Sequence, residues 1–250
     1  MEKVKIVRRA PFDFPGITNT LLLPRRKFAM NAERPYWNRR DAGRILAAHV
    51  RHTIRASAET VVLALPRGGV PVGFEVAQAL RAPLDVLVVR KLGLPEQPEM
   101  AMGAIAAGGH EVLDHALIGS LGISPLQIAA VADRETAELR RREELYRGDR
   151  PVPAVRGKIV VLVDDGLATG FTMRAAITAV RARGAAKVVV AVPVGAPESC
   201  VELSREVDWL ICPLQPADFS AVGFWYQDFT PTTDEEVCEC LDAANSPVHP

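Results

Sequence analysis

A chain of 250 residues is long enough to bury a large core, and its 30 basic and 30 acidic side chains cancel to a formal charge of zero. This balance argues against a broad nucleic-acid-binding surface. The first nine residues have no apolar segment of the secretory type, and no later apolar run approaches the roughly 18 residues that cross a bilayer, so we expect a soluble, cytoplasmic protein without membrane contact.

Helical and strand patterns alternate along the chain, which is typical of a parallel sheet with helices on both faces. We expect Asp41 to cap the first helix and Ser124, followed by Pro125, to begin the third. The expected helices cover residues 40–57, 70–80, 125–147, 171–183 and 197–205, and the expected strands cover residues 60–65, 84–89, 159–163, 187–192 and 209–212. The sequence therefore predicts an α/β fold built on an open, mostly parallel, twisted sheet.

We expect the chain to be divided into three parts. Residues 1–36 carry four prolines and form an N-terminal arm that wraps the surface or an oligomer partner. Residues 37–213 form the core, and residues 214–250 form a small aromatic hood and a tail with a short helix after Asp234. The charged run at residues 140–144 is interpreted as a solvated helix face rather than an anion site.

The loop Pro66-Arg67-Gly68-Gly69 leaves the first expected core strand at its carboxyl end and precedes a helix. Its two glycines allow close approach of the backbone to a ligand, and Arg67 offers a planar fork of donors to phosphate oxygens. By itself an Arg-Gly-Gly loop is a weak signal, but its position fits a pyrophosphate site.

Arg90 and Lys91 follow the next expected strand and precede a Gly- and Pro-rich stretch. Two cations there could neutralise a pyrophosphate leaving group. Residues 91–103 lack periodicity and are interpreted as a mobile lid, with a short hairpin inside residues 91–109. The alternative is an ordinary exposed loop with two solvated cations.

The most informative segment is residues 159–172, where an apolar strand runs into Asp164 and Asp165 and then into a Thr- and Gly-containing turn that opens a helix. Ligands bind at the carboxyl ends of strands in open α/β sheets, and a helix start favours an anion. The carboxylates could hold sugar hydroxyls or Mg²⁺ while the turn holds a phosphate. The alternative is structural, since Asp often ends strands and Thr often caps helices.

Aromatic side chains gather near the C-terminal end of the chain, and their ring faces could stack on a flat heterocycle or simply close a core. They are Phe219, Phe224, Trp225, Tyr226 and Phe229. The four cysteines, at positions 200, 212, 238 and 240, lack the spacing of a zinc site or a disulfide framework and are interpreted as reduced thiols.

Residues 160–172, with two acids followed by Thr-Gly-Phe-Thr, resemble the phosphoribosyl-pyrophosphate (PRPP) motif of the type I phosphoribosyltransferases. Residues 65–70 resemble that family's pyrophosphate loop, which often carries a non-proline cis peptide. Arg90-Lys91 and the loop after it resemble the catalytic-loop region of adenine phosphoribosyltransferase. The resemblance covers about residues 41–229 and implies the type I phosphoribosyltransferase fold, a homodimer, PRPP as co-substrate and Mg²⁺ as cofactor.

The resemblance also implies a role for each matched residue. Asp164 and Asp165 would bind the ribose hydroxyls, directly or through Mg²⁺, and Arg67, Gly68 and Gly69 would receive the pyrophosphate. The 5-phosphate would lie on Ala168, Thr169, Gly170, Phe171 and Thr172. Residues 219–226 resemble the Phe-Val-Val-Gly-Tyr hood of the hypoxanthine-guanine enzymes, with one additional residue, so the base would stack on Phe219, Phe224, Trp225 or Tyr226.

The acceptor is expected to be a small nitrogenous base, with a purine favoured by the resemblance. Position 168 carries Ala where the 6-oxopurine enzymes carry an acid, and in this respect the chain is similar to the adenine enzymes. Those enzymes draw an acid from their mobile loop, for which Glu96 and Glu99 are candidates. An inactive PRPP-binding sensor or regulator remains the alternative to an enzyme.

Overall fold

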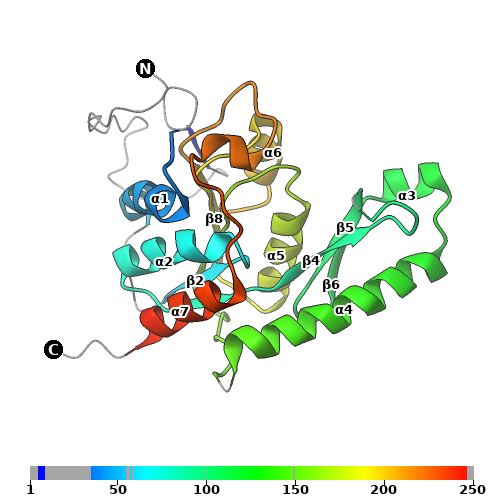
Figure 1. The fold of residues 1–250 in the computed structure, drawn as a ribbon, viewed down its shortest axis with the longest axis horizontal. Helices are drawn as coiled ribbons and strands as arrows, with labels where there is room; N and C mark the ends of the chain where they lie inside the picture. The colour runs from blue at the N-terminus through cyan, green and yellow to red at the C-terminus, as the bar shows by residue number, and fades with distance from the viewer. Residues whose placement is uncertain are drawn as a thin grey trace.

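Six strands form the central sheet, in the order β1-β9-β8-β7-β2-β3 (Figure 1). Five of them run parallel, namely β2 (Thr60–Ala64), β3 (Leu84–Val86), β7 (Ile159–Val163), β8 (Lys187–Ala191) and β9 (Trp209–Cys212). Strand β1 (Lys5–Arg8) pairs antiparallel with β9 at one edge. The computed structural model describes residues 5–8, 35–54, 57, 59–98, 100–148 and 150–246, so most of the expected N-terminal arm lies outside the described residues.

The central strands are buried on both faces, which explains their continuous apolar sequences. On β2, for example, Val61 and Leu63 belong to one buried cluster, while Val62 belongs to the cluster on the opposite face. Helices α1 (Arg39–Thr53), α2 (Gly69–Leu80) and α7 (Asp234–Asn245) contribute to the cluster of Val62, and α5 (Phe171–Ala182) and α6 (Pro197–Leu203) contribute to the other. Figure 1 shows the sheet between these two groups of helices. The predicted α/β class and parallel sheet are confirmed.

A second, antiparallel sheet of three strands projects from the core together with two helices (Figure 1). Its strands are β4 (Val89–Gly93), β5 (Ala101–Ala106) and β6 (His110–Leu113), and its helices are α3 (His115–Leu121) and α4 (Pro125–Arg147). Alanines of β5 and α5 pack together, which allows this sheet to lie close to the core. We call β4, β5, β6, α3 and α4 the arm, which is distinct from the expected N-terminal arm of residues 1–36.

The arm corrects two sequence predictions. The strand expected at residues 84–89 is broken at Leu87 and Val88, where the chain leaves the central sheet and enters the arm. The stretch from residue 91 to 103, interpreted as a lid without periodicity, begins in β4 and ends in β5, and residues 94–100 connect the two strands. The short hairpin is confirmed and is larger than expected, because β6 extends it.

Helix starts follow their predicted chemistry in one case and not in another. Ser124 caps α4 through a capping box with Gln127, as Ser-Pro predicts. The first helix begins three residues earlier than a cap at Asp41 would allow, because Asn38 is the cap and its side chain accepts a hydrogen bond from the Asp41 backbone N–H at 3.0 Å. The prediction that Asp41 is the cap was wrong.

No helix among the described residues is both long and apolar enough to cross a bilayer.

Candidate active site

Two loops meet at the carboxyl edge of the sheet because their strands, β2 and β7, are parallel neighbours. The backbone N–H of Leu65 donates to the carbonyl of Val163 at 2.8 Å, which aligns the two strand ends. A Cβ placed on Gly69 would lie 2.8 Å from that same carbonyl oxygen, so only glycine permits this approach. The structure thus brings Gly68 and Gly69 beside Asp164 and Asp165, and the Pro66–Arg67 peptide bond is cis.

The helix after the second loop begins as the sequence predicts. Gly170 caps α5 with a φ of +80°, a conformation that glycine adopts readily, and α5 starts at Phe171. Ala168 and Thr169 are exposed, and Thr172 is partly exposed. The hydroxyl of Ser199 donates to the carbonyl of Ala168 at 2.5 Å and fixes this turn against α6. Residues 168–172 therefore form an accessible turn at a helix N-terminus, where an anion is favoured.

The two carboxylates occupy a partly buried position in which charge is disfavoured. Burial, with the neighbouring charge of Asp165 as a second cause, raises the pKa of Asp164 well above its usual range. Burial also raises the pKa of Asp165, and the nearby Arg39 guanidinium opposes that increase. Asp164 Oδ1 accepts a hydrogen bond from the Asp165 backbone N–H at 2.8 Å. The site therefore favours a cation or hydrogen-bond donors that would compensate these carboxylates.

Arg39 is a site residue that sequence reasoning missed. From the first turn of α1, its Nε donates to Asp165 Oδ2 at 2.8 Å, although 126 residues separate the two in the chain. A further nitrogen, Nη1, donates to the carbonyl of Thr230 at 2.7 Å, and the guanidinium lies 3.9 Å from the centre of the Phe229 ring. Nothing in the sequence around Arg39 marks this contact.

The aromatic segment forms a small cluster against the loop of Asp165. The Tyr226 hydroxyl donates to the Asp165 carbonyl at 2.5 Å, and its ring lies 5.5 Å from that of Tyr36 and 5.0 Å from that of Phe229, centre to centre. Tyr226 is only 1% exposed, so its ring is enclosed by these neighbours and offers no open face to a base.

The other aromatic residues expected at the base differ in exposure. Phe219 and Trp225 are partly buried and pack against this cluster, whereas Phe224 is 57% exposed on a 3₁₀ turn at Val222–Trp225. The Trp225 Nε1 atom is buried, with no hydrogen-bond partner among the described residues. Of the four residues expected at the base, Phe224 therefore has the most accessible ring.

The three cations expected at the pyrophosphate lie in different environments. Arg67 is 41% exposed, and its Nη1 lies 3.9 Å from Asp234 Oδ1 at the start of α7. Arg90 is bound within the arm, where its Nε and Nη2 donate to Glu135 Oε2 at 3.0 and 2.8 Å. Lys91 is exposed on β4. Glu96 is exposed in the turn after β4, and Glu99 lies outside the described residues.

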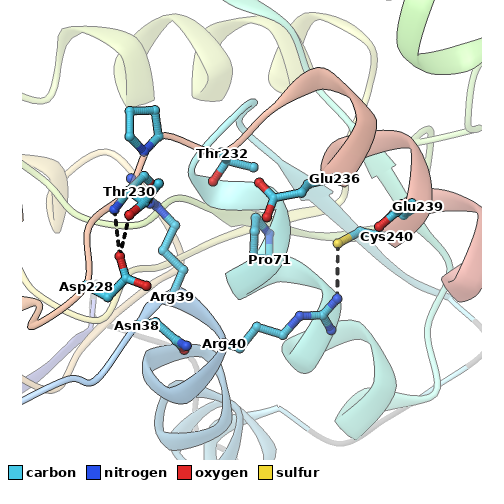
Figure 2. Close-up of a pocket in the computed structure, with 11 residues that line it drawn as sticks. Asn38, Arg39, Arg40, Pro71, Asp228, Thr230, Thr232, Glu236, Glu239 and Cys240 are labelled. Carbon is cyan, nitrogen blue, oxygen red and sulfur yellow. Dashed lines mark hydrogen bonds between the residues drawn. The ribbon is translucent and has the colours of Figure 1, made fainter.

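A cavity of about 210 Å³ opens beside the site, between the start of α1, residues 228–232 and α7 (Figure 2). Its lining includes Arg39 and Arg40 together with Asp228, Glu236 and Glu239, so its charge is mixed. Asp164 and Asp165 do not line it. The loops at residues 66–69 and 164–172 instead lie at the carboxyl edge of the sheet, after β2 and β7.

The four cysteines are free, and Cys200, Cys212 and Cys240 are buried. Within the described residues, no group of three or more His, Cys, Asp or Glu side chains is arranged to hold a metal ion.

Comparisons with known proteins agree with this geometry. A family model described as the phosphoribosyl transferase domain matches residues 38–227, a span that includes the loops at residues 66–69 and 164–172 and the aromatic residues 219–226. Proteins from two strains of Mycobacterium tuberculosis, CDC 1551 and H37Rv, carry the provisional name of phosphoribosyl transferase, and each is 47% identical over 208 residues. These residues are 83% of this chain and 46% of each relative, so the chain spans about half the length of the curated relatives it matches.

One solved structure is similar to this chain over nearly the whole length of the solved protein. The crystal structure of TT1426 from Thermus thermophilus has 43% sequence identity and a TM-score of 0.70, covering 82% of this chain and 97% of that one. An open parallel sheet with an acidic loop and a glycine loop at its carboxyl edge places these loops where open α/β proteins bind their ligands. Together with the family match, this shows that the chain belongs to the phosphoribosyl transferase domain family, as the PRPP-like motif predicted.

Proposed function

We propose that the protein transfers the 5-phosphoribosyl group of PRPP to a nitrogenous base, with a purine favoured, and releases pyrophosphate. The observation that carries the proposal is the meeting of residues 66–69, 164–165 and 168–172 at one edge of the sheet. A pyrophosphate, a ribose and a 5-phosphate need three such adjacent sites. The family membership supports the same reaction class.

Each group of residues would act on a different part of PRPP. The turn at residues 168–172 would hold the 5-phosphate with backbone N–H groups, and Asp164 and Asp165 would accept hydrogen bonds from the ribose hydroxyls. Arg67, with the backbone at Gly68 and Gly69, would bind the pyrophosphate and stabilise the charge that grows on it. For Arg90 to take part, it would have to exchange Glu135 for the substrate. Lys91 is exposed at the next position of β4.

The transfer step breaks the bond between C1 of the ribose and the pyrophosphate oxygen and forms a bond from C1 to a ring nitrogen of the base. The bonding pair leaves with pyrophosphate, which can also take up the proton that the base nitrogen gives up. Positive charge develops at C1 as in glycoside cleavage, and the carboxylates of Asp164 and Asp165 would favour it. Phe224, Phe219 and Trp225 would contact the base, while Tyr226 holds the loop of Asp165.

The paired carboxylates fit a magnesium ion that is bound mainly by substrate oxygens. They are hard oxygen ligands, and their burial favours a compensating cation. Bound Mg²⁺ would withdraw charge from the pyrophosphate. Asp164 is the better placed ligand, because Asp165 is already paired with Arg39.

A homodimer is part of the proposal. The arm carries exposed leucines at its far end, Leu121 at 54% and Leu126 at 81%, which would be covered by a second copy. Light scattering during size-exclusion chromatography measures this assembly directly.

The test is pyrophosphate release from PRPP and Mg²⁺ with a panel of purine, pyrimidine and pyridine bases. We expect base-dependent release that Asp165→Asn abolishes while the melting temperature changes little. Binding of PRPP measured by calorimetry, without release with any base, would favour a PRPP sensor over a transferase. Unchanged turnover in Asp165→Asn would remove that residue from the mechanism.

A further inference from the structure

Arg39 joins three parts of the chain that are far apart in sequence. Its side chain is 11% exposed and that of its partner Asp165 is 15% exposed, so the ion pair is largely removed from water. The other two contacts, to the Thr230 carbonyl and to the Phe229 ring, come from the segment before α7. Such a pair is more than a surface contact, because each partner left alone would be a poorly solvated charge.

The pair also lies directly against the glycine loop. A Cβ on Gly68 would be 2.1 Å from Asp165 Oδ2 and 3.0 Å from Arg39 Nε. The backbone of one phosphate-binding loop therefore contacts the ion pair that fixes the other loop. A change in the position of the Arg39 guanidinium would move both the Asp165 carboxylate and the space beside Gly68.

We propose that Arg39 is a positioning residue for Asp165, which it holds by Oδ2 so that the carboxylate faces the ribose of PRPP. This inference rests on the proposed function. Phe229 and Thr230 fix the guanidinium in turn, so residues 229 and 230 contribute to the ribose site without touching the substrate. Arginine is required because one planar group makes a hydrogen bond through Nε, another through Nη1 and a stacking contact with a ring, which an ammonium group cannot combine.

The next residue, Arg40, provides a matched control. It lies in the same first turn of α1 and also makes an ion pair, to Glu75 at 3.3 Å, and a ring contact, to Phe74 at 4.4 Å. Its Nη2 donates to Cys240 Sγ of α7 at 3.4 Å (Figure 2). Loss of Arg40 therefore removes similar interactions without changing the proposed ribose site.

The experiment measures PRPP binding by calorimetry and steady-state kinetics for the wild type, Arg39→Gln, Arg39→Lys, Arg40→Gln and Asp165→Asn, and for Arg39→Gln combined with Asp165→Asn. We expect Arg39→Gln to weaken PRPP binding and raise its KM by about 10- to 100-fold, the effect of losing a charge-assisted hydrogen bond. The KM for the base should not change. Arg39→Lys should recover part of the loss, and Arg40→Gln should bind PRPP like the wild type.

The combined variant separates positioning from general stability. If Arg39 acts through Asp165, Arg39→Gln should have almost no further effect on PRPP affinity once Asp165 is Asn. Equal PRPP affinity in Arg39→Gln and Arg40→Gln, with wild-type PRPP binding intact, would overturn this inference and leave the proposed function standing. A wild type that does not bind PRPP would overturn the proposed function itself. If Arg39→Gln does not fold, Arg39→Lys replaces it in the same comparison, and wild-type affinity in that variant contradicts the inference.

Discussion

Gly68 lies so close to Asp165 that a methyl group on its Cα would be 2.1 Å from the carboxylate oxygen Oδ2. This distance is far below any tolerated contact, so one of the two loops would have to move. The proposed pyrophosphate and ribose sites therefore constrain each other through a single backbone position.

Gly68→Ala should for this reason lower activity strongly while leaving a folded protein. We expect kcat/KM for PRPP to fall by about 100-fold, in line with the effect of a 1 Å displacement of a catalytic group. Gly119→Ala is the control, because Gly119 lies inside α3 and a Cβ added there would meet no neighbouring group within 4 Å. Its activity should match the wild type, and its stability should rise by about 0.5–1 kcal/mol. Equal activity in the two variants would show that the two loops are not coupled.

Tyr226→Phe should weaken PRPP binding as well as lower stability. The hydroxyl that it removes donates to the Asp165 carbonyl, whereas the ring contacts with Tyr36 and Phe229 remain. The loss of one hydrogen bond should cost about 0.5–1.5 kcal/mol of unfolding free energy. Tyr36→Phe removes a hydroxyl that donates to the Pro193 carbonyl at 2.8 Å and serves as the control. Denaturant unfolding should show similar losses in both, and only Tyr226→Phe should raise the KM for PRPP.

Arg90→Gln and Glu135→Gln together test whether Arg90 serves the reaction or only the arm. Each substitution breaks the same ion pair between β4 and α4, so each should lower stability by about 1 kcal/mol. Arg90→Gln alone should raise the KM for PRPP, because Glu135→Gln leaves the cation in place. Identical kinetics in both variants would show that Arg90 fastens the arm and does not contact pyrophosphate.

His49 should make the protein less stable on the acid side of neutrality. Burial, followed by the charge of His52, lowers the pKa of His49 from its usual value near 6.5. The folded state then binds the proton less readily than the unfolded state, so its contribution to stability is complete above about pH 6.5 and is lost as the pH falls from there through the lowered pKa of the folded state. The melting temperature of His49→Gln between pH 7 and pH 5 should therefore vary less than that of the wild type. His115→Gln, at an exposed position, is the control, and a wild-type slope in His49→Gln would refute the assignment.

The parts of the fold that could be predicted are those that local sequence determines. Residues 159–163 are apolar without alternation, and a strand covered on both faces is the arrangement that such a run favours. Ser124 and Pro125 start a helix by their own side chains, with no help from distant residues. The loops at residues 66–69 and 164–172 could both be placed at the carboxyl edge because each follows a strand of the expected parallel sheet, and the structure adds that these strands are neighbours.

The features that could not be predicted depend on contacts between distant residues. Arg39 contacts Asp165 across 126 residues of sequence. From the sequence alone, any of the 30 basic residues could have been the partner of Asp165. The aromatic residues of the hood have the same sequence pattern whether they stack on a ligand or on each other, and only the fold shows that Tyr226 is enclosed. The break at Leu87 and Val88 follows from the competing arm sheet, which nothing in an apolar strand pattern reveals.

The contact between Arg67 and Asp234 has a consequence for how binding responds to ionic strength. In the free protein a carboxylate at the start of α7 already lies near the cation proposed to receive pyrophosphate. Substrate entry is then an exchange of one anion for another, and dissolved salt weakens the old contact as well as the new one. The affinity for PRPP should consequently decline less steeply with added salt than the charges of the substrate alone would suggest.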